Sequence, residues 1–527
     1  MRMWSRREML IAGGTTLALA ACSSGSVTSG SGAAPSTVVV GSGLVLPGDP
    51  AVERRDALRR KAGASTVATT ITAAPVTVNI GGREVETWAF GDRPGSGAVR
   101  ARAGDLIEAA FLNQLPSTNT LHWHGIALRN DMDGVHGLTQ TSVDPGNRFT
   151  YRFTYRFTAP DAGTYWFHPH MGLELDRGLY APLIIEDPAE PVAYDVDVVV
   201  MLDDWLDGYG RTQEQVHAGL QSGGGHSGHM GTTGASSGGM GGTGGMGGMG
   251  GMGSSGGMGS MMGGGLTGDV TYPLHVINGR APSERETFDV KAGQRVRIRL
   301  INAGSDTAYR VAVGGHRLTV THADGFPVQP IEVDNVVLGM GERYDVIVTA
   351  GSGVFPIVAV PEGKDDPAAE AVLRTTAGAT VAIGSRPSEL SGRTPAYQDL
   401  VATEAARLPK QAPDRTTTID LTASMTGYVH GIGGRSFPDS APVTVSEGER
   451  LRLKIVNDTM MFHPIHLHGH TFEMVGEGSA RKDTVNVLPM TSVEVDIAAD
   501  NPGQWMLHCH NTYHLESGMA TVFSYRT

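Results

Sequence analysis

The chain is poor in cysteine and in positive charge. Its 527 residues include two cysteines, Cys22 and Cys509, so at most one disulfide bond could form, and that bond would pin the N-terminal tail to the last strand. We therefore expect each cysteine to have its own chemistry. Lysine and arginine number 41 against 54 acidic residues, and a net charge of −13 argues against a nucleic-acid partner, because phosphate binding needs clustered positive side chains.

The N-terminal segment lacks an apolar run long enough to span a bilayer. Leu10 to Ala21 is apolar or small and is typical of an export signal. The pair Arg6-Arg7 within S-R-R-x-M-L resembles a twin-arginine signal, and L-A-A-C resembles a lipoprotein cleavage box in which Cys22 becomes the lipidated first residue. Cleavage after Ala21 without lipid, or an uncleaved tether, are the alternatives. We expect an exported protein that is lipid-anchored at the outer face of the cytoplasmic membrane, in the periplasm or cell envelope.

One pattern of glycine, strand and asparagine occurs three times in a chain rich in alternating Val, Thr, Ile, Phe and Tyr. Gly104–Asn113, Gly293–Asn302 and Gly448–Asn457 each place a turn glycine before a period-two strand that ends in Asn. Copies this far apart indicate domain-sized antiparallel sandwiches or barrels rather than a solenoid. The predicted organisation is a signal over 1–21, a tether over 22–66 with a short surface helix at 53–64, and three domains over 67–190, 191–390 and 398–527.

Ten of the 19 histidines lie in four tight clusters in the first and third copies of this pattern. One His-x-His is usually a half-buried strand pair, but the clusters recur at matching places in two copies and are absent from the middle copy. Core packing does not account for that arrangement, so we interpret the clusters as metal ligands. They are His122/His124, His168/His170, His463/His466/His468 and His508/His510/His514.

Strand geometry divides these residues between two sites. Side chains at i and i+2 share a face and the residue between them points the other way, so His508 and His510 face one site and Cys509 the other. The Cys509 site also has His463, His514 and, as a long axial partner, Met519; two imidazoles, a thiolate and a thioether form the blue-copper set. The second site has eight imidazoles, which suit about three ions. Zinc is the rival metal, but it takes three or four protein ligands and gives Cys509 no use in electron transfer.

The motifs H-W-H-G, H-P-H, H-P-I-H-L-H-G and H-C-H-N-T-Y-H-L-E-S-G-M resemble the four copper motifs of the multicopper oxidases, and the similarity covers about residues 67–527. The resemblance implies an all-β fold of three cupredoxin-like Greek-key β-sandwich domains, and an oxidoreductase that passes single electrons through Cys509 to a centre that reduces dioxygen to water. It implies four copper ions: type 1 on His463, Cys509, His514 and Met519, type 2 on His122 and His466, and a type 3 pair on His124, His168, His170, His468, His508 and His510.

Reduction of dioxygen also needs protons. Asp133, nine residues beyond His124 and followed by Gly134, stands where similar enzymes place an acidic relay; the alternative is a simple turn aspartate. Some relatives carry an acid directly after the second type 1 histidine. This chain has Leu515 there and Glu516 one step further on, which leaves a role for Glu516 in proton delivery open.

Two local features bear on the electron donor. Residues 222–265 form a Gly/Ser-rich insert with two histidines, His226 and His229, and eight methionines, which we expect to be a mobile loop. Thioethers are soft ligands that favour cuprous copper, whereas the alternative is a neutral linker. The methionines are Met230, Met240, Met246, Met249, Met252, Met258, Met261 and Met262. The second feature is Asp458-Thr459-Met460-Met461 before His463, where Asp458, Met460 and Met461 are candidate ligands of a cuprous substrate or simple strand packing.

The sequence therefore predicts a cuprous oxidase of the bacterial copper-tolerance type, acting with O2 on Cu(I) or a small reductant. A laccase-like phenol oxidase or a ferroxidase is the alternative within the family. A copper-storage protein is the non-enzymatic alternative, although storage needs no electron path. A two-domain nitrite reductase is disfavoured because all four motifs lie in one chain. Three domains suffice for a monomer, which is the expected state.

Overall fold

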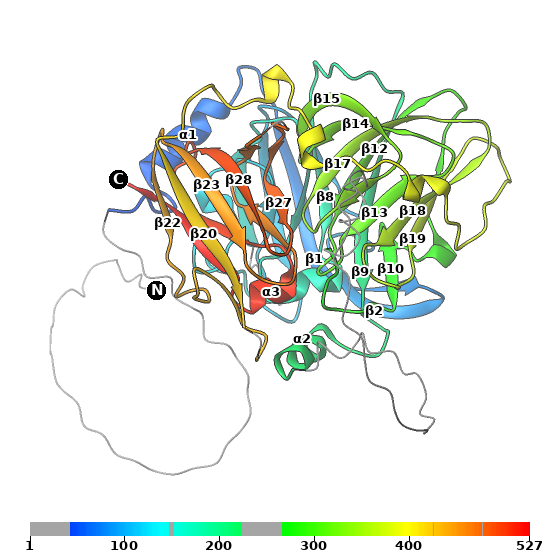
Figure 1. Ribbon diagram of the computed structural model, residues 1–527, viewed down its shortest axis with the longest axis horizontal. Coiled ribbons are helices and arrows are strands. Elements are labelled where there is room, and N and C mark those ends of the chain that lie inside the picture. The colour runs from blue at the N-terminus through cyan, green and yellow to red at the C-terminus, as the bar shows by residue number, and fades with distance from the viewer. Residues whose placement is uncertain (1–42, 147–151, 224–265, 425, 477) are drawn as a thin grey trace, which may run out of the picture. The chain divides into compact units, whose positions relative to one another are not determined.

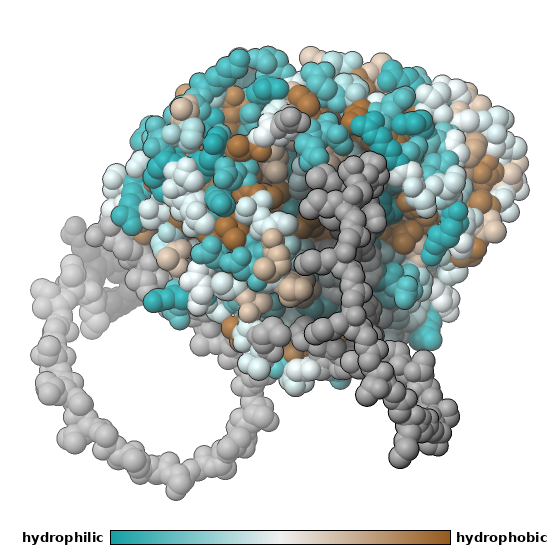
Figure 2. All heavy atoms as spheres, in the orientation of Figure 1, coloured by the Kyte–Doolittle hydropathy of each residue, from teal (hydrophilic) through white to brown (hydrophobic). Residues whose placement is uncertain are grey.

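The computed structural model describes residues 43–146, 152–223, 266–424, 426–476 and 478–527 (Figure 1). The predicted signal, the lipidation site Cys22 and residues 224–265 of the methionine-rich insert lie outside these described residues. Within the described ranges, no helix is long and apolar enough to cross a membrane. On the face drawn in Figure 2, hydrophilic residues predominate and hydrophobic ones are scattered between them.

The described chain is built from three pairs of β-sheets, which confirms the all-β prediction. In the first pair, the sheets have the orders β2-β1-β4-β6 and β3-β8-β7-β5. In the second pair the orders are β10-β9-β12-β17-β14-β15 and β11-β19-β18-β13-β16. In the third they are β21-β20-β23-β28-β25-β26 and β22-β30-β29-β24-β27. Non-sequential neighbours in every sheet are typical of Greek-key sandwiches, and we call the pairs the first, second and third sandwich.

The strands of the first sandwich are β1 Thr66–Ile80, β2 Arg83–Ala89, β3 Val99–Arg102, β4 Leu106–Asn113, β5 His122–His124, β6 Arg152–Thr158, β7 Gly163–His168 and β8 Ala181–Glu186. Those of the second are β9 Val196–Trp205, β10 Leu274–Ile277, β11 Thr287–Asp289, β12 Arg295–Asn302, β13 Tyr309–Val313, β14 Leu318–Ala323, β15 Phe326–Val333, β16 Val336–Leu338, β17 Arg343–Thr349, β18 Val354–Pro361 and β19 Ala369–Arg374.

Those of the third are β20 Arg415–Ala423, β21 His430–Ile432, β22 Val443–Ser446, β23 Arg450–Asn457, β24 His463–Leu467, β25 Phe472–Met474, β26 Arg481–Lys482, β27 Thr484–Val487, β28 Thr491–Ala498, β29 Gln504–Cys509 and β30 Ala520–Arg526. The α-helices described are α1 Pro50–Arg59, α2 Gln213–Gln221 and α3 Thr512–Glu516. The short 3-10 helices are η1 Asn130–Met132, η2 Glu174–Arg177, η6 Pro282–Glu284, η7 Ser388–Ser391, η8 Tyr397–Asp399 and η9 Glu404–Ala406.

The repeated glycine–strand–asparagine pattern occupies the same place in each sandwich. Strands β4, β12 and β23 each pair in parallel with the first long strand of their sandwich and antiparallel with a later one. The side-chain amide of the terminal Asn is buried each time. It donates to the backbone carbonyls of Ser117 and Val143 for Asn113, and to those of Thr307 and Leu338 for Asn302. The asparagine therefore ties the strand end to two loops, which a hydrophobic residue could not do.

The tether predicted over 22–66 is packed structure from Gly43 onward. Helix α1 begins at Pro50 behind an Asp49 side chain that accepts a hydrogen bond from the Ala51 amide, and its Val52 is buried in the main core. The helix predicted at 53–64 on the surface thus starts and ends earlier and is anchored. Residues before it bond to the other end of the chain: the Val45 amide donates to the Tyr525 carbonyl at 3.0 Å and the Thr527 amide to the Gly43 carbonyl at 3.0 Å.

The second sandwich departs from simple alternation of buried and exposed residues. Along β12, Arg297 and Arg299 are buried although the period-two pattern would put them in water. Both arginines bond the carboxylate of Asp345, and Arg299 also donates to the Thr164 hydroxyl of the first sandwich at 2.8 Å. The outer face of β12 is therefore covered by the first sandwich.

Replacing Asn302 with alanine tests the role of the strand-end asparagines. The Asn302→Ala change leaves the buried carbonyls of Thr307 and Leu338 without this donor, and we expect the free energy of unfolding of the metal-free protein to fall by about 3 kcal/mol. The exposed Asn79, whose side chain accepts from the Gly82 amide, is the matched control, and Asn79→Ala should change stability by less than about 0.5 kcal/mol. Urea unfolding curves measure both; equal effects would contradict the assignment.

Candidate metal centres

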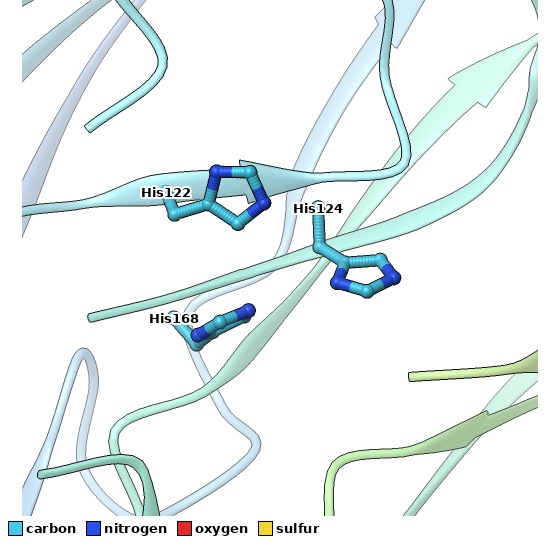
Figure 3. A group of neighbouring side chains, drawn as sticks. All are labelled: His122, His124 and His168. Carbon is cyan, nitrogen blue, oxygen red and sulfur yellow. The ribbon is translucent and has the colours of Figure 1, made fainter. Parts of the chain in front are cut away.

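The eight histidines of the predicted second site converge from the first and third sandwiches. Strand β5 carries His122 and His124 and pairs with β7, which carries His168. Figure 3 shows these three side chains as neighbours. Strand β24 carries His466 opposite His508 on β29. Across the two sandwiches the ring of His122 stacks on that of His468, with centroids 3.7 Å apart, and His124 stacks on His466 at 3.8 Å. His170 and His510 complete the cluster, their rings 5.1 Å from His508 and 5.3 Å from His168 respectively.

The nitrogens of this eight-histidine cluster are arranged as metal ligands. The Nδ1 atoms of four rings lie 2.8–3.0 Å from backbone carbonyl oxygens, as for His122 with Asp133 and His508 with Cys509. Among the described residues, the buried Nε2 atoms of His122, His168 and His466 have no hydrogen-bond partner. The Nε2 atoms of His468 and His508 face each other at 3.0 Å. Lone pairs held together in this way, without protons, need a cation between them.

Burial keeps these imidazoles neutral. Desolvation lowers the pKa of His168, His170, His468, His508 and His510 well below the usual value, and neighbouring imidazoles lower the pKa further because two charged rings would repel. A neutral imidazole is the form that binds a metal ion. The donor set therefore fits several soft or borderline cations such as copper.

The second cluster is a triangle of one sulfur and two nitrogens. The Sγ atom of Cys509 lies 3.7 Å from Nδ1 of His463 and 3.5 Å from Nδ1 of His514, and the two nitrogens are 3.1 Å apart. The outer nitrogens are occupied: Nε2 of His463 bonds the Thr459 hydroxyl at 2.8 Å and Nε2 of His514 bonds Asp269 at 3.1 Å. These outer partners aim both Nδ1 atoms at the sulfur, as in a preformed metal site.

Met519 lies beside this triangle. Its side chain is buried, its carbonyl accepts from the Cys509 amide at 3.0 Å, and its amide donates to the His514 carbonyl at 3.0 Å. The residues predicted for the blue-copper set are therefore gathered at one place. His508 and His510 join the eight-histidine cluster while Cys509 points to the triangle, so one tripeptide connects the two.

Asp133 lies between the first and third sandwiches at the eight-histidine cluster. One carboxylate oxygen is 2.9 Å from Nδ1 of His468 and the other 3.2 Å from Nδ1 of His122. Desolvation raises the pKa of Asp133 above its usual value, although His122 opposes the rise. The following Gly134 has φ +84°, and a Cβ there would lie 2.0 Å from the Leu121 carbonyl, so only glycine allows this turn to pack on the strand with His122.

Two further carboxylates contact the clusters and were missed by the sequence analysis. Asp269 bonds His514, as described above, and Asp483 lies 3.2 Å from Nε2 of His124 and 3.4 Å from Nδ1 of His466. Burial alone would raise the pKa of Asp483, but Arg343 and the two histidines hold it well below its usual range. The only sequence signal for Asp269 is its place just after the methionine-rich insert.

The residues predicted to bind a cuprous substrate lie at the surface beside the triangle. Asp458 is exposed, Met460 is 79% exposed and Met461 is half-buried, all in the turn between β23 and β24. Glu516 is also exposed, and it lines a small cavity together with four cluster histidines, His168, His170, His508 and His510.

The fold and the two buried clusters are those of a copper-dependent oxidoreductase built from cupredoxin-like sandwiches. Family models described as multicopper oxidase match residues 72–190, 197–378 and 410–527. The chain belongs to the multicopper oxidase family, whose members use copper as cofactor.

Two relatives and one solved structure illustrate the similarity. The multicopper oxidase MmcO of Mycobacterium tuberculosis is 42% identical over 528 residues, covering 99% of this chain and 97% of that protein. Copper resistance protein A of Escherichia coli is 28% identical, covering 85% of this chain and 91% of that protein. The crystal structure of laccase from Botrytis aclada superposes with a TM-score of 0.69 at 22% identity, covering 87% of this chain and 88% of that one, and shows the shared fold.

Gly341 of the second sandwich offers a test of the eight-histidine cluster. A Cβ at this position, where φ is +86°, would lie 2.9 Å from Cδ2 of His510 and 3.0 Å from Cε1 of His124. We expect Gly341→Ala to displace both rings and weaken copper binding at the cluster about 10–100-fold. Gly293→Ala is the matched control, because φ is +84° there and nothing lies within 4 Å, so it carries the same backbone strain without the clash. Copper titration of the metal-free variants measures the effect; equal affinities would contradict it.

Proposed function

We propose that the protein is a cuprous oxidase that couples one-electron oxidation of Cu(I) to the four-electron reduction of O2 to water, in the service of copper tolerance. The observation that carries the proposal is the position of the stems of the methionine-rich insert, which both end beside the Cys509 triangle. The relatives support it, since one of them is named a copper resistance protein.

Four copper ions are part of this proposal. His463, Cys509, His514 and Met519 would hold a type 1 ion, His122 and His466 a type 2 ion, and the type 3 pair would be held by His124, His168, His170, His468, His508 and His510. When bound, copper supplies the electron transfer and the chemistry of dioxygen. The protein's residues fix the ligand nitrogens, exclude water and connect the two centres through the Cys509 tripeptide.

The stems of the insert reach the triangle from two directions. The last helix before it, α2, carries His217, whose Nε2 lies 3.1 Å from the Ser517 hydroxyl three residues beyond His514. Directly after the insert, Leu266 packs in one apolar cluster with Phe462, the residue before His463. Asp269 then bonds His514. The two segments that flank an insert with eight thioethers therefore contact residues at the Cys509 triangle, where a cuprous ion would deliver its electron.

Exposed methionines of the described chain lie in two neighbouring turns near the Cys509 triangle, and we call this place the exposed methionine edge. The Asn457 amide donates to the carbonyls of Met461 and Leu488, which holds the turn before His463 against the turn that contains Met490. Met460 is 79% and Met490 63% exposed, and Met490 has φ +55°, a strained value for a residue other than glycine. Solvent-exposed methionines beside the exposed carboxylate of Asp458 suit a soft monovalent cation.

Asp133 is the proposed proton relay. It is fully buried, it contacts the outer nitrogens of His122 and His468, and burial raises its pKa. A carboxyl group with these properties can hold a proton beside the eight-histidine cluster and release it when charge builds up there. Glu516, which lines the small cavity next to four of the histidines, is the candidate for proton supply from water.

Export and anchoring complete the proposal. A twin-arginine signal over 1–21 and lipid on Cys22 would place the enzyme at the outer face of the cytoplasmic membrane, as a monomer facing the periplasm or cell envelope. Both features lie outside the described residues and rest on the sequence motifs alone.

A laccase-like activity on phenols, or a ferroxidase activity, is the second candidate, favoured by the similarity to a laccase in fold. A copper-storage protein is the non-enzymatic alternative. Oxygen consumption by the copper-loaded protein with cuprous ion, ferrous ion and a phenol separates all three. Turnover on cuprous ion with the highest kcat/KM is the expected result, and absence of oxygen uptake on every reductant would leave storage as the function.

The insert is tested by removing its thioethers in two ways. We expect deletion of 222–265 to raise the KM for cuprous ion about tenfold, equivalent to about 1.4 kcal/mol of lost binding, and to leave small phenols unaffected or faster. A variant of full length in which the eight methionines are replaced by serine should reproduce the KM effect. Steady-state oxygen uptake measures both. An equal loss on cuprous ion and phenol would contradict a capture role.

The exposed methionine edge is tested separately. Met490→Leu keeps the volume and removes the sulfur, so combined with Met460→Leu it should raise the KM for cuprous ion severalfold without changing kcat on a phenol. Met474→Leu on β25, where the side chain is buried, is the control and should leave both values unchanged. If the double variant oxidises cuprous ion as the unaltered protein does, this edge does not bind the substrate.

A further inference from the structure

Arg343 is a fully buried arginine that touches all three sandwiches. It begins β17 of the second sandwich, and its Nη1 donates to the Gly341 carbonyl of the same sandwich at 3.2 Å. Its Nε donates to the Thr164 carbonyl on β7 of the first sandwich at 3.0 Å. Its Nη1 and Nη2 each donate to a carboxylate oxygen of Asp483 in the third sandwich at 2.7 Å. The two-pronged geometry fixes both the position and the plane of that carboxylate.

The Arg343–Asp483 pair occupies space that one glycine leaves open. Gly125 directly follows His124 and has φ +87°; a Cβ there would lie 2.4 Å from Nη2 of Arg343 and 2.7 Å from Oδ2 of Asp483. The last position of the H-W-H-G motif is thus glycine because an ion pair from the other two sandwiches packs against it. The Arg343–Asp483 pair therefore lies next to His124, the residue that precedes Gly125.

His124 is oriented differently from its neighbours in the eight-histidine cluster. His122, His168, His466 and His508 direct Nδ1 to backbone carbonyls, which leaves Nε2 for a metal ion. His124 instead directs Nε2 to the Asp483 carboxylate at 3.2 Å. Its buried Nδ1 has no hydrogen-bond partner among the residues the structure describes. An acceptor at Nε2 fixes the proton there, so the lone pair of Nδ1 points into the cluster.

We propose that Arg343 is a positioning residue for the eight-histidine cluster. Its Nη1 and Nη2 atoms hold the Asp483 carboxylate, and that carboxylate fixes the tautomer and ring plane of His124. Nδ1 of His124 is then the ligand atom. The second sandwich, which supplies no histidine to the cluster, thereby sets the geometry of a ligand that the first sandwich contributes. The proposal concerns the copper-binding site alone and is independent of which reductant the enzyme uses.

The test is Arg343→Lys, since lysine keeps the charge but cannot bind a carboxylate through two parallel donors. We expect the variant to bind copper at the Cys509 triangle with unchanged affinity and colour. At the eight-histidine cluster we expect copper affinity to fall about 10–100-fold, with an altered electron paramagnetic resonance spectrum for the ions that remain. Copper per chain at increasing strengths of a competing chelator measures the two affinities in the full-length protein.

Arg299→Lys is the matched control. Arg299 is equally buried, binds the Asp197 carboxylate through two nitrogens and also bonds Thr164, through its hydroxyl, but it contacts no residue of either cluster among those described. It should load both centres normally. If Arg343→Lys loads the cluster with unchanged affinity and spectrum, or if Arg299→Lys weakens the cluster equally, the proposal is overturned.

Asp483→Asn, which preserves the shape of the side chain, is the variant to measure if Arg343→Lys does not fold. Asp483→Asn keeps the size of the side chain but removes the charge that the guanidinium grips, and its amide group would oppose one Arg343 nitrogen. Loss of copper from the eight-histidine cluster with the triangle intact supports the proposal. Normal loading of both centres by Asp483→Asn overturns it.

Discussion

The pairing of β24 with β29 is the constraint on which the rest of the site depends. His466 lies opposite His508 and Ile465 opposite Cys509, so two imidazoles face the first sandwich while the thiol turns to the other side of the sheet. Because side chains alternate along a strand, a slip of one residue would exchange the two faces and destroy both centres together. The two centres are therefore one structural unit, connected through a single pair of strands.

Three carboxylates contact ring nitrogens of the histidines that form the two clusters. Asp133 contacts His122 and His468, Asp269 contacts His514, and Asp483 contacts His124 and His466. Each fixes an outer nitrogen and so decides which nitrogen is left for metal. Each also brings a negative charge close to a place where positive ions would collect, which offsets part of the cost of burying those ions in a dry interior.

The sequence predicted the histidine clusters, the opposite orientation of Cys509 and the three repeats. All of these follow from the two-residue alternation of side chains along a strand or from short local motifs. It did not predict Asp269, Asp483 or Arg343. Each acts across a boundary between sandwiches, more than a hundred residues away from one of its partners, and no local period records such a contact. Arg297 and Arg299 alternate with apolar residues along β12, a pattern typical of a strand with one face in water, yet both are buried against the first sandwich. The start of α1 was missed although Asp49 and Pro50 together mark a helix N-terminus.

The hydrogen bonds between Gly43–Val45 and Tyr525–Thr527 close the folded chain on itself. Residues 43–45 and the C-terminal residues are therefore neighbours at the edge of the third sandwich. A covalent link from Thr527 to residue 43, with a new opening in an exposed turn far from the metal ligands, would give a circularly permuted enzyme in which the first and third sandwiches still meet. In such an enzyme the order of the sandwiches along the chain would change while their packing stayed the same.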